Sequence, residues 1–426
     1  MSGVPAAGGG PVPGVEAPAG PAVPGRRPRS GFWAAAFAFL IVMAVATLPS
    51  PLYGLYRTRD HLSALTITVV FAIFAAGTIA VLRRDSAIAA RIGRRGTMLA
   101  AVATMIVAMV VLAAWKDLPG LLVGRLVTGV SVGLAAGTAI TYLIELRLRA
   151  DPRASPARAQ TIGTSVTVGA LGIGPLIAGC LAQWVAQPLT VPYLVFVVLG
   201  VAALAGLWAA PETGAPARPA AGEGKPAGPR RKARLPVPAA AGTLAAFAAN
   251  GLFAGLSGLF LVTTLHQPAH ALAGVALFLV FASGVASQLA TTGLRAPRVL
   301  ALGTASLLAG LALLVVSVRL ATPSLALFLV GGALIGAGSG AVFKGTTGIV
   351  LAASPPENRV AMTSDLLIAL YVGLAVPVIG AGVALDLGAS APDTVLGFAV
   401  IVGLGVVASG WALLARPRGT RSSPGT

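Results

Sequence analysis

The chain has 426 residues, of which 56% are hydrophobic and only 10% are charged, and its formal net charge is +18. A soluble domain carries about 25% charged residues, so this composition excludes an ordinary water-soluble protein and indicates a polytopic membrane protein. The positive charge does not indicate a nucleic-acid partner, because the basic residues lie in short runs between apolar segments and form no single patch.

Residues 1–30 precede the first apolar segment and are rich in Pro, Gly and Ala. Such a composition buries too little apolar surface to fold, so we expect a disordered cytoplasmic tail. The first apolar segment is long and has no small-residue cleavage site. It therefore predicts an uncleaved membrane helix rather than a signal peptide.

Twelve apolar segments are long enough to cross about 30 Å of hydrocarbon. They predict an all-α polytopic membrane protein with 12 transmembrane helices arranged as two six-helix repeats. The predicted spans are 32–55, 63–82, 97–115, 119–146, 158–184, 190–210, 239–265, 270–292, 298–318, 323–352, 361–384 and 394–415.

The longest loop, 211–238, is polar and rich in Pro and Gly, so we expect it to be a cytoplasmic linker. It separates an N-terminal half, 31–210, from a C-terminal half, 239–416, and residues 417–426 form a second tail. Most Lys and Arg residues lie in the tails and in the loops after even-numbered spans. Positive loops stay in the cytoplasm, which predicts a cytoplasmic membrane location with both termini inside.

The two halves contain a matching sequence. Residues 127–140, "VTGVSVGLAAGTAI", align without gaps on 330–343, "VGGALIGAGSGAVF", and Pro175 matches Pro377. Repeats of one orientation are typical of some secondary transporters. The alternative is that glycine-rich apolar helices of one composition align by chance.

Residues 86–95, "SAIAARIGRR", resemble a loop motif of the major facilitator superfamily. The family pattern is Gly, three residues, Asp, a basic residue, any residue, Gly and two basic residues. Gly93 and three arginines match, whereas Ser86 and Ala90 replace the Gly and the Asp. In the family the Asp anchors this loop to the eleventh helix, here 361–384. The alternative is that this loop is positively charged only because it lies on the cytoplasmic side of the membrane.

Two further motifs carry the same resemblance. "GRLVTGVSVG" contains the family's Arg-x-x-x-Gly pattern, and "GALGIGPLIAG", 169–179, resembles the helix-5 signature of its drug/proton antiporter branches. A proline inside a helix bends it, and glycines let neighbouring helices approach closely. A conformational hinge is therefore expected, with static packing as the alternative. The predicted hinge residues are Gly129, Gly172, Gly174, Pro175, Gly179 and Pro377.

The resemblance implies that the spans 32–55, 119–146, 239–265 and 323–352 line a central substrate cavity. Polar residues on these spans are few, and an Arg within the membrane is expected to face the bundle interior or a wet cavity. Snorkelling to the membrane interface is the alternative for the long basic side chains. The predicted cavity residues are Tyr53, Arg125, Asn250 and Lys344.

The resemblance also implies a cytoplasmic gate. In many relatives a Glu at the inner end of the fourth helix pairs with basic residues of the 2–3 loop and with an Arg before the fifth helix. We expect Glu145 to form such a latch with Arg91, Arg95 and Arg158. Asp365 is expected to pair with Lys344 or to carry a coupling proton.

These features predict a transporter that works by alternating access, with proton-coupled efflux of small, partly hydrophobic molecules. An uptake carrier for a small, possibly anionic, metabolite is the close alternative; a non-transporting receptor or a membrane enzyme is more distant. The 12 acids and three histidines are scattered without metal-ligand spacing, so we expect no enzyme activity, cofactor or metal. The expected partners are the substrate, the proton and the lipid bilayer, and the expected state is a monomer.

Overall fold

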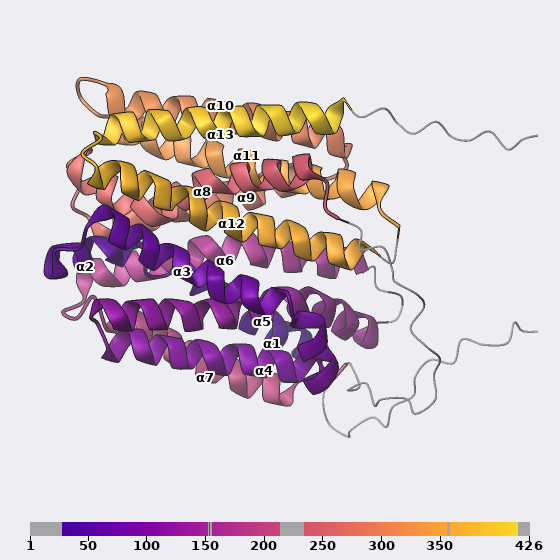
Figure 1. The fold of residues 1–426 in the computed structure, drawn as a ribbon. Helices are drawn as coiled ribbons and strands as arrows, with labels where there is room; N and C mark the ends of the chain where they lie inside the picture. The colour runs from indigo at the N-terminus through magenta and orange to yellow at the C-terminus, as the bar shows by residue number, and fades with distance from the viewer. Residues whose placement is uncertain (1–27, 152, 154–155, 214–233, 356–357, 416–426) are drawn as a thin grey trace, which may run out of the picture.

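The computed structural model describes residues 28–151, 153, 156–213, 234–355 and 358–415, and every regular element in these ranges is a helix (Figure 1). Most of the predicted tails and linker lie outside the described residues. The elements are α1 (Pro28–Ala44), the short 3-10 helix η1 (Ser50–Leu52), α2 (Tyr53–Asp60), α3 (Ala64–Leu82), α4 (Asp85–Ala114), α5 (Leu118–Ala150), α6 (Pro156–Trp184), α7 (Val191–Ala209), α8 (Val237–Thr263), α9 (His270–Ala290), α10 (Ala296–Arg319), α11 (Leu325–Ala353), α12 (Arg359–Asp386) and α13 (Ala391–Leu414).

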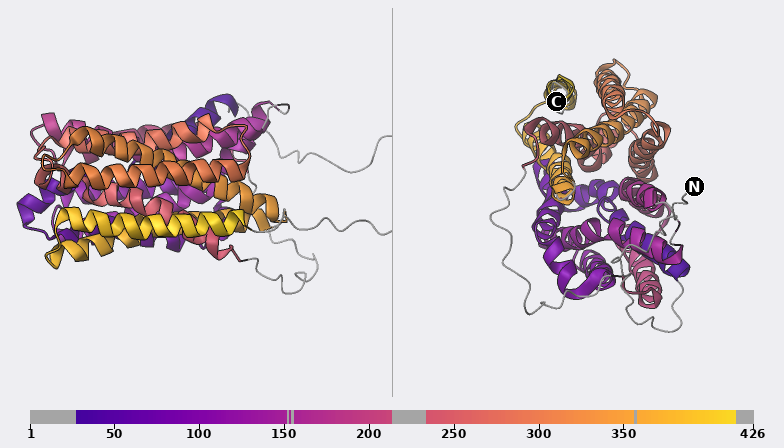
Figure 2. Two further views of the ribbon diagram at one scale, coloured as in Figure 1. Left: turned by 90° about the horizontal axis from the view of Figure 1, so that it is seen from above. Right: turned by 90° about the vertical axis from the view of Figure 1, so that its right-hand side faces the viewer.

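The helices form two bundles that lie side by side (Figures 1 and 2). The first contains α1 to α7 and the second contains α8 to α13. The bundles meet along two helix pairs, α6 with α9 and α3 with α12. Helix α1 begins and α13 ends at the same end of the molecule, which we call the proximal end; α2 lies at the opposite, distal end (Figure 1). The predicted all-helical fold is confirmed.

The first predicted span, 32–55, is not a continuous helix. Helix α1 ends at Ala44, the chain turns, and helical structure resumes in η1 and α2. Pro49 and Pro51 lack the N–H that would continue a helical hydrogen-bond ladder, so the chain closes shorter turns, in which the Leu52 N–H donates to the Pro49 carbonyl over 2.9 Å. In the described residues, 11 helices are long and apolar enough to cross a membrane, and Ser30–Ala44 is shorter. The remaining crossing is therefore composite.

The aligned glycines of the two halves occupy equivalent positions. Gly133 on α5 faces α3, where an added Cβ would strike the carbonyl oxygen of Thr78; its aligned partner, Gly336 on α11, faces α9, where it would strike that of Val280. Helices α3 and α9 are the counterparts of each other in the two predicted repeats. Both contacts bring main chain against main chain, which is how small residues support helix association in lipid.

Candidate functional site

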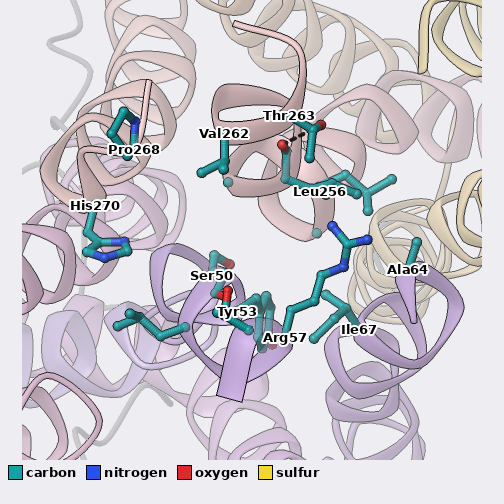
Figure 3. Close-up of a pocket in the computed structure, with 16 residues that line it drawn as sticks. Ser50, Tyr53, Arg57, Ala64, Ile67, Leu256, Val262, Thr263, Pro268 and His270 are labelled. Atoms are coloured by element: carbon teal, nitrogen blue, oxygen red, sulfur yellow. Dashed lines mark hydrogen bonds between the residues drawn. The ribbon is translucent and has the colours of Figure 1, made fainter. Parts of the chain in front are cut away.

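A cavity of about 300 Å³ lies at the distal end, between the two halves. One wall comes from η1, α2 and the start of α3, and the other from the end of α8 and the start of α9 (Figure 3). The volume is within the range of small-molecule pockets. Its lining is mainly apolar, and the polar or charged members are Ser50, Tyr53, Arg57, Thr58, Thr263 and His270.

Arg57 carries the one fixed charge among the described residues that line this cavity. It belongs to the last turn of α2, and its Nε donates a 3.3 Å hydrogen bond to the carbonyl of Leu62. The side chain extends from α2 toward the face of α8 that carries Leu256 (Figure 3). The turn thus fixes the position of the guanidinium and leaves its terminal nitrogens directed to the cavity side.

The hydroxyl groups of the cavity fall into two sets. Thr58 and Thr263 donate to carbonyls of their own helices over 3.0 and 2.9 Å, so neither hydroxyl proton is available to a ligand. The side-chain oxygens of Ser50 and Tyr53 are buried and have no hydrogen-bond partner among the described residues. Tyr53, one of the predicted cavity residues, therefore lies in this wall.

Arg125, predicted to line the substrate cavity, lies instead inside the first half and is fully buried. Its Nη1 donates to the Ala46 carbonyl over 2.7 Å and its Nη2 to the Phe71 carbonyl over 3.1 Å, and the guanidinium lies 4.6 Å from the ring centroid of Phe74. Ala46 lies in the interruption of the first span. The guanidinium thus supplies a donor where Pro49 cannot.

Asn250 and Lys344 also bind protein groups and do not line the distal cavity. Asn250 Nδ2 donates to Ser339 Oγ over 3.0 Å, which joins α8 to α11. Lys344 Nζ donates to the Gln288 carbonyl over 2.5 Å and to Thr291 Oγ1 over 3.2 Å. A helix leaves its last carbonyls unpaired, so a nearby ammonium caps them favourably. Lys344 therefore caps the end of α9.

The predicted latch has a different pairing. Glu145 forms its ion pair with Arg94, over 2.8 Å, rather than with Arg91 or Arg95. Arg95 donates instead to main-chain carbonyls at the end of α7, and Arg91 is exposed. Arg158 belongs to α6, but its side chain lies outside the described residues.

Glu212 anchors the loop that lacks the family's Asp. Its Oε1 accepts hydrogen bonds from the backbone N–H groups of Arg94 and Arg95, over 3.0 and 3.2 Å. The backbone at Gly93 has φ +77°, and an added Cβ would meet the Glu212 carboxylate. The chain therefore holds this loop to the end of α7. The sequence signal was the "PET" at 211–213, whose role in binding the loop was not predicted.

Asp365 lies on α12 and is half-buried. No hydrogen bond or ion pair joins its side chain to another described residue. The expected pair with Lys344 does not form, because the ammonium caps α9 instead.

The predicted hinge glycines of α6 contact two different helices, α9 and α1. Gly172 and Gly179 pack on α9, where an added Cβ would come within 3.1 Å of the Cα atoms of Phe278 and Gly274 respectively. Gly174 packs on the main chain of Ala44 within the first half. Two of the three glycines thus lie at the interface between the halves. Pro175 lies inside α6 and Pro377 inside α12, the two helices at equivalent edges of the interface.

Two equivalent hydrogen-bonded caps join the halves at the distal end. Gln183 Oε1, at the end of α6, accepts from the His270 N–H at the start of α9 over 2.9 Å. The Asp386 carboxylate, at the end of α12, accepts from the N–H groups of Ala64 and Leu65 at the start of α3, over 3.0 and 3.3 Å. Gln183 and Asp386 have the same sequence separation as Gly129 and Gly332. Each cap includes a residue that lines the cavity, His270 in one and Ala64 in the other.

Two helical bundles that share a cavity, and that meet along glycine-rich helix pairs, define a membrane transport protein. A family model described as Major Facilitator Superfamily matches residues 35–309. The chain belongs to this superfamily.

A mutant form of the nucleoside transporter NupG has a similar solved structure, with a TM-score of 0.67 and 10% sequence identity. The match covers 91% of this chain and 99% of that chain. At this identity the similarity concerns the fold. No curated protein sequence gives a significant match.

Proposed function

We propose that the protein is a secondary active transporter that works by alternating access and exports small, partly hydrophobic molecules in exchange for protons. The observation that carries the proposal is the distal cavity, whose walls come from both halves. Rocking of one half against the other would open or close such a cavity without unfolding either bundle. The mainly apolar lining fits a partly hydrophobic cargo.

In this proposal the proximal end faces the cytoplasm, as the positive-inside rule predicts. Opening toward the outside breaks the caps made by Gln183 and Asp386, and opening toward the cytoplasm separates the proximal parts of α6 and α9. Gly172 and Gly179 keep the middle and distal parts of the α6–α9 contact free of side chains that would block movement. The resemblance of the α6 motif to antiporters supports export.

Asp365 is the acid that we assign to proton coupling. It lies on a helix at the interface and has no ionic partner among the described residues, so its protonation breaks no ion pair. In liposomes containing the purified protein, Asp365→Asn is expected to abolish transport driven by a pH gradient and to leave substrate exchange at equal pH intact. The exposed Asp117 provides the control, because Asp117→Asn is expected to leave both activities unchanged. Equal loss of both activities in Asp365→Asn would contradict this role.

The second candidate function is uptake of a small anion, which Arg57 in the cavity favours. Flux into sealed vesicles with pH gradients imposed in either direction, against a panel of neutral, anionic and cationic compounds, separates the two. Accumulation driven by an alkaline interior supports proton-linked uptake, whereas accumulation driven by an acidic interior supports antiport. Absence of flux for every compound and gradient would contradict transport itself.

A further inference from the structure

The distal cavity contains hydrogen-bond donors that the protein itself does not use. Ser50 and Tyr53 are 4% and 3% exposed, respectively, and their hydroxyl oxygens have no partner among the described residues. Both oxygens are also closed off from the cavity space, so these two residues form part of its wall and offer no donor to a ligand. Arg57 instead offers a guanidinium whose Nε donates to the Leu62 carbonyl and whose terminal nitrogens have no hydrogen-bond partner among the described residues.

The charges around the cavity are unbalanced. No Asp or Glu belongs to the described residues that line it. Of the acids in this region, Asp60 pairs with Arg59 over 2.6 Å, and Asp386 accepts from the N–H groups of Ala64 and Leu65 without lining the cavity. With one guanidinium and no carboxylate in the lining, the cavity attracts negative charge.

We propose that this cavity binds a small organic monoanion, in which a carboxylate is joined to an apolar body. Arg57 holds the carboxylate through its terminal N–H groups, which suit planar oxyanions. The apolar residues of α3 and α8, including Ile67 and Leu256, enclose the body (Figure 3). This inference deepens the proposed transport function and rests on it, because it names the class of compound carried.

The test measures ligand binding and not transport. A negative result for anion binding can therefore be told apart from a negative result for transport. The purified full-length protein in lipid nanodiscs is titrated with 4-fluorobenzoate, 4-fluorobenzamide and 4-fluorobenzylamine. These probes have one aromatic body and carry negative, zero and positive charge. Binding is read from the fluorine NMR line width, after subtraction of the signal from empty nanodiscs.

We expect saturable binding of 4-fluorobenzoate, with at least about tenfold weaker binding of the amide and the amine, since a charge-assisted hydrogen bond contributes about one to two decades in affinity. Arg57→Gln should weaken benzoate binding about tenfold and leave the amide unchanged. Arg57→Lys should retain part of the affinity, because it keeps the charge but loses the planar fork.

Arg59 provides a matched control two residues away. It is exposed and pairs with Asp60 outside the cavity, so Arg59→Gln is expected to change benzoate affinity less than twofold. Equal effects of Arg57→Gln and Arg59→Gln, equal affinities for benzoate and benzamide, or no saturable benzoate binding would each overturn the inference. Benzoate binding without any measured flux would instead retain the inference about the site and contradict transport.

Discussion

Replacing Arg125 with glutamine is expected to destabilise the first half and to leave the distal cavity's affinity for ligand unchanged in the protein that remains folded. The guanidinium binds the carbonyls of Ala46 and Phe71 at once, and glutamine is too short to reach both. The Ala46 carbonyl then stays buried without a donor. We expect the loss of roughly 3 kcal/mol of stability, since one unpaired buried polar group costs about 1–3 kcal/mol and the packing on Phe74 is lost as well.

The measurement is the thermal unfolding midpoint of the purified protein, followed by tryptophan fluorescence, together with 4-fluorobenzoate binding. Arg125→Lys should fall between wild type and Arg125→Gln, because an ammonium supplies donors without the planar fork. Arg59→Gln, on an exposed ion pair, should change stability by less than about 1 kcal/mol. A stable Arg125→Gln protein that no longer binds ligand would show that Arg125 is a substrate residue after all.

Cross-linking α6 to α9 near the proximal end is expected to stop transport completely and reversibly. An added Cβ at Gly169 lies 3.4 Å from Cγ2 of Val285, the atom that a cysteine sulfur would replace, so we expect a small side-chain adjustment to bring the two sulfurs to bonding distance. The experiment combines Gly169→Cys and Val285→Cys in a Cys180→Ala background, since Cys180 is the one native cysteine. Oxidation joins the halves, and movement between them becomes impossible.

The control is a cross-link within one half. An added Cβ at Gly206 on α7 lies 3.3 Å from the Cβ of Ala34 on α1, and both helices belong to the first bundle. Oxidation of Gly206→Cys with Ala34→Cys should leave transport unchanged, because each half moves as a unit. Restoration of flux by dithiothreitol in the Gly169 and Val285 pair would exclude permanent damage. Continued flux through that oxidised pair would contradict movement at this interface.

The arrangement of spans could be predicted from the sequence because lipid restricts spanning chains to helices and closed barrels. Each long apolar segment of the sequence therefore predicts one transmembrane helix. The interruption at 45–49 was missed although Pro49 and Pro51 were visible, since hydropathy over a long segment does not register which carbonyls lose their donors. Helical structure continues in α2 to Asp60, and this extension brings Arg57 into the cavity wall. Arg57 was not among the cavity residues predicted from the sequence.

The side-chain partners were harder to predict. Arg125 and Lys344 bind main-chain carbonyls, and a sequence does not show which carbonyls lack donors. The partner of Glu145 was misassigned for a different reason. Gly93 adopts a positive φ inside α4, so the helical register before it does not continue after it. As a result Arg94 faces Glu145, whereas Arg91 and Arg95, the partners expected in this loop, do not.

The central claim is that the two halves move relative to each other at the distal end, and a distance measurement across that end tests it most directly. Spin labels at Gln187→Cys and Leu387→Cys, which lie on the two halves, report the separation by double electron–electron resonance in the Cys180→Ala background. We predict two distance populations, with the longer one increased by Asp386→Ala, because this change removes the cap on α3. A single narrow distance that neither Asp386→Ala, nor pH, nor 4-fluorobenzoate changes would contradict alternating access.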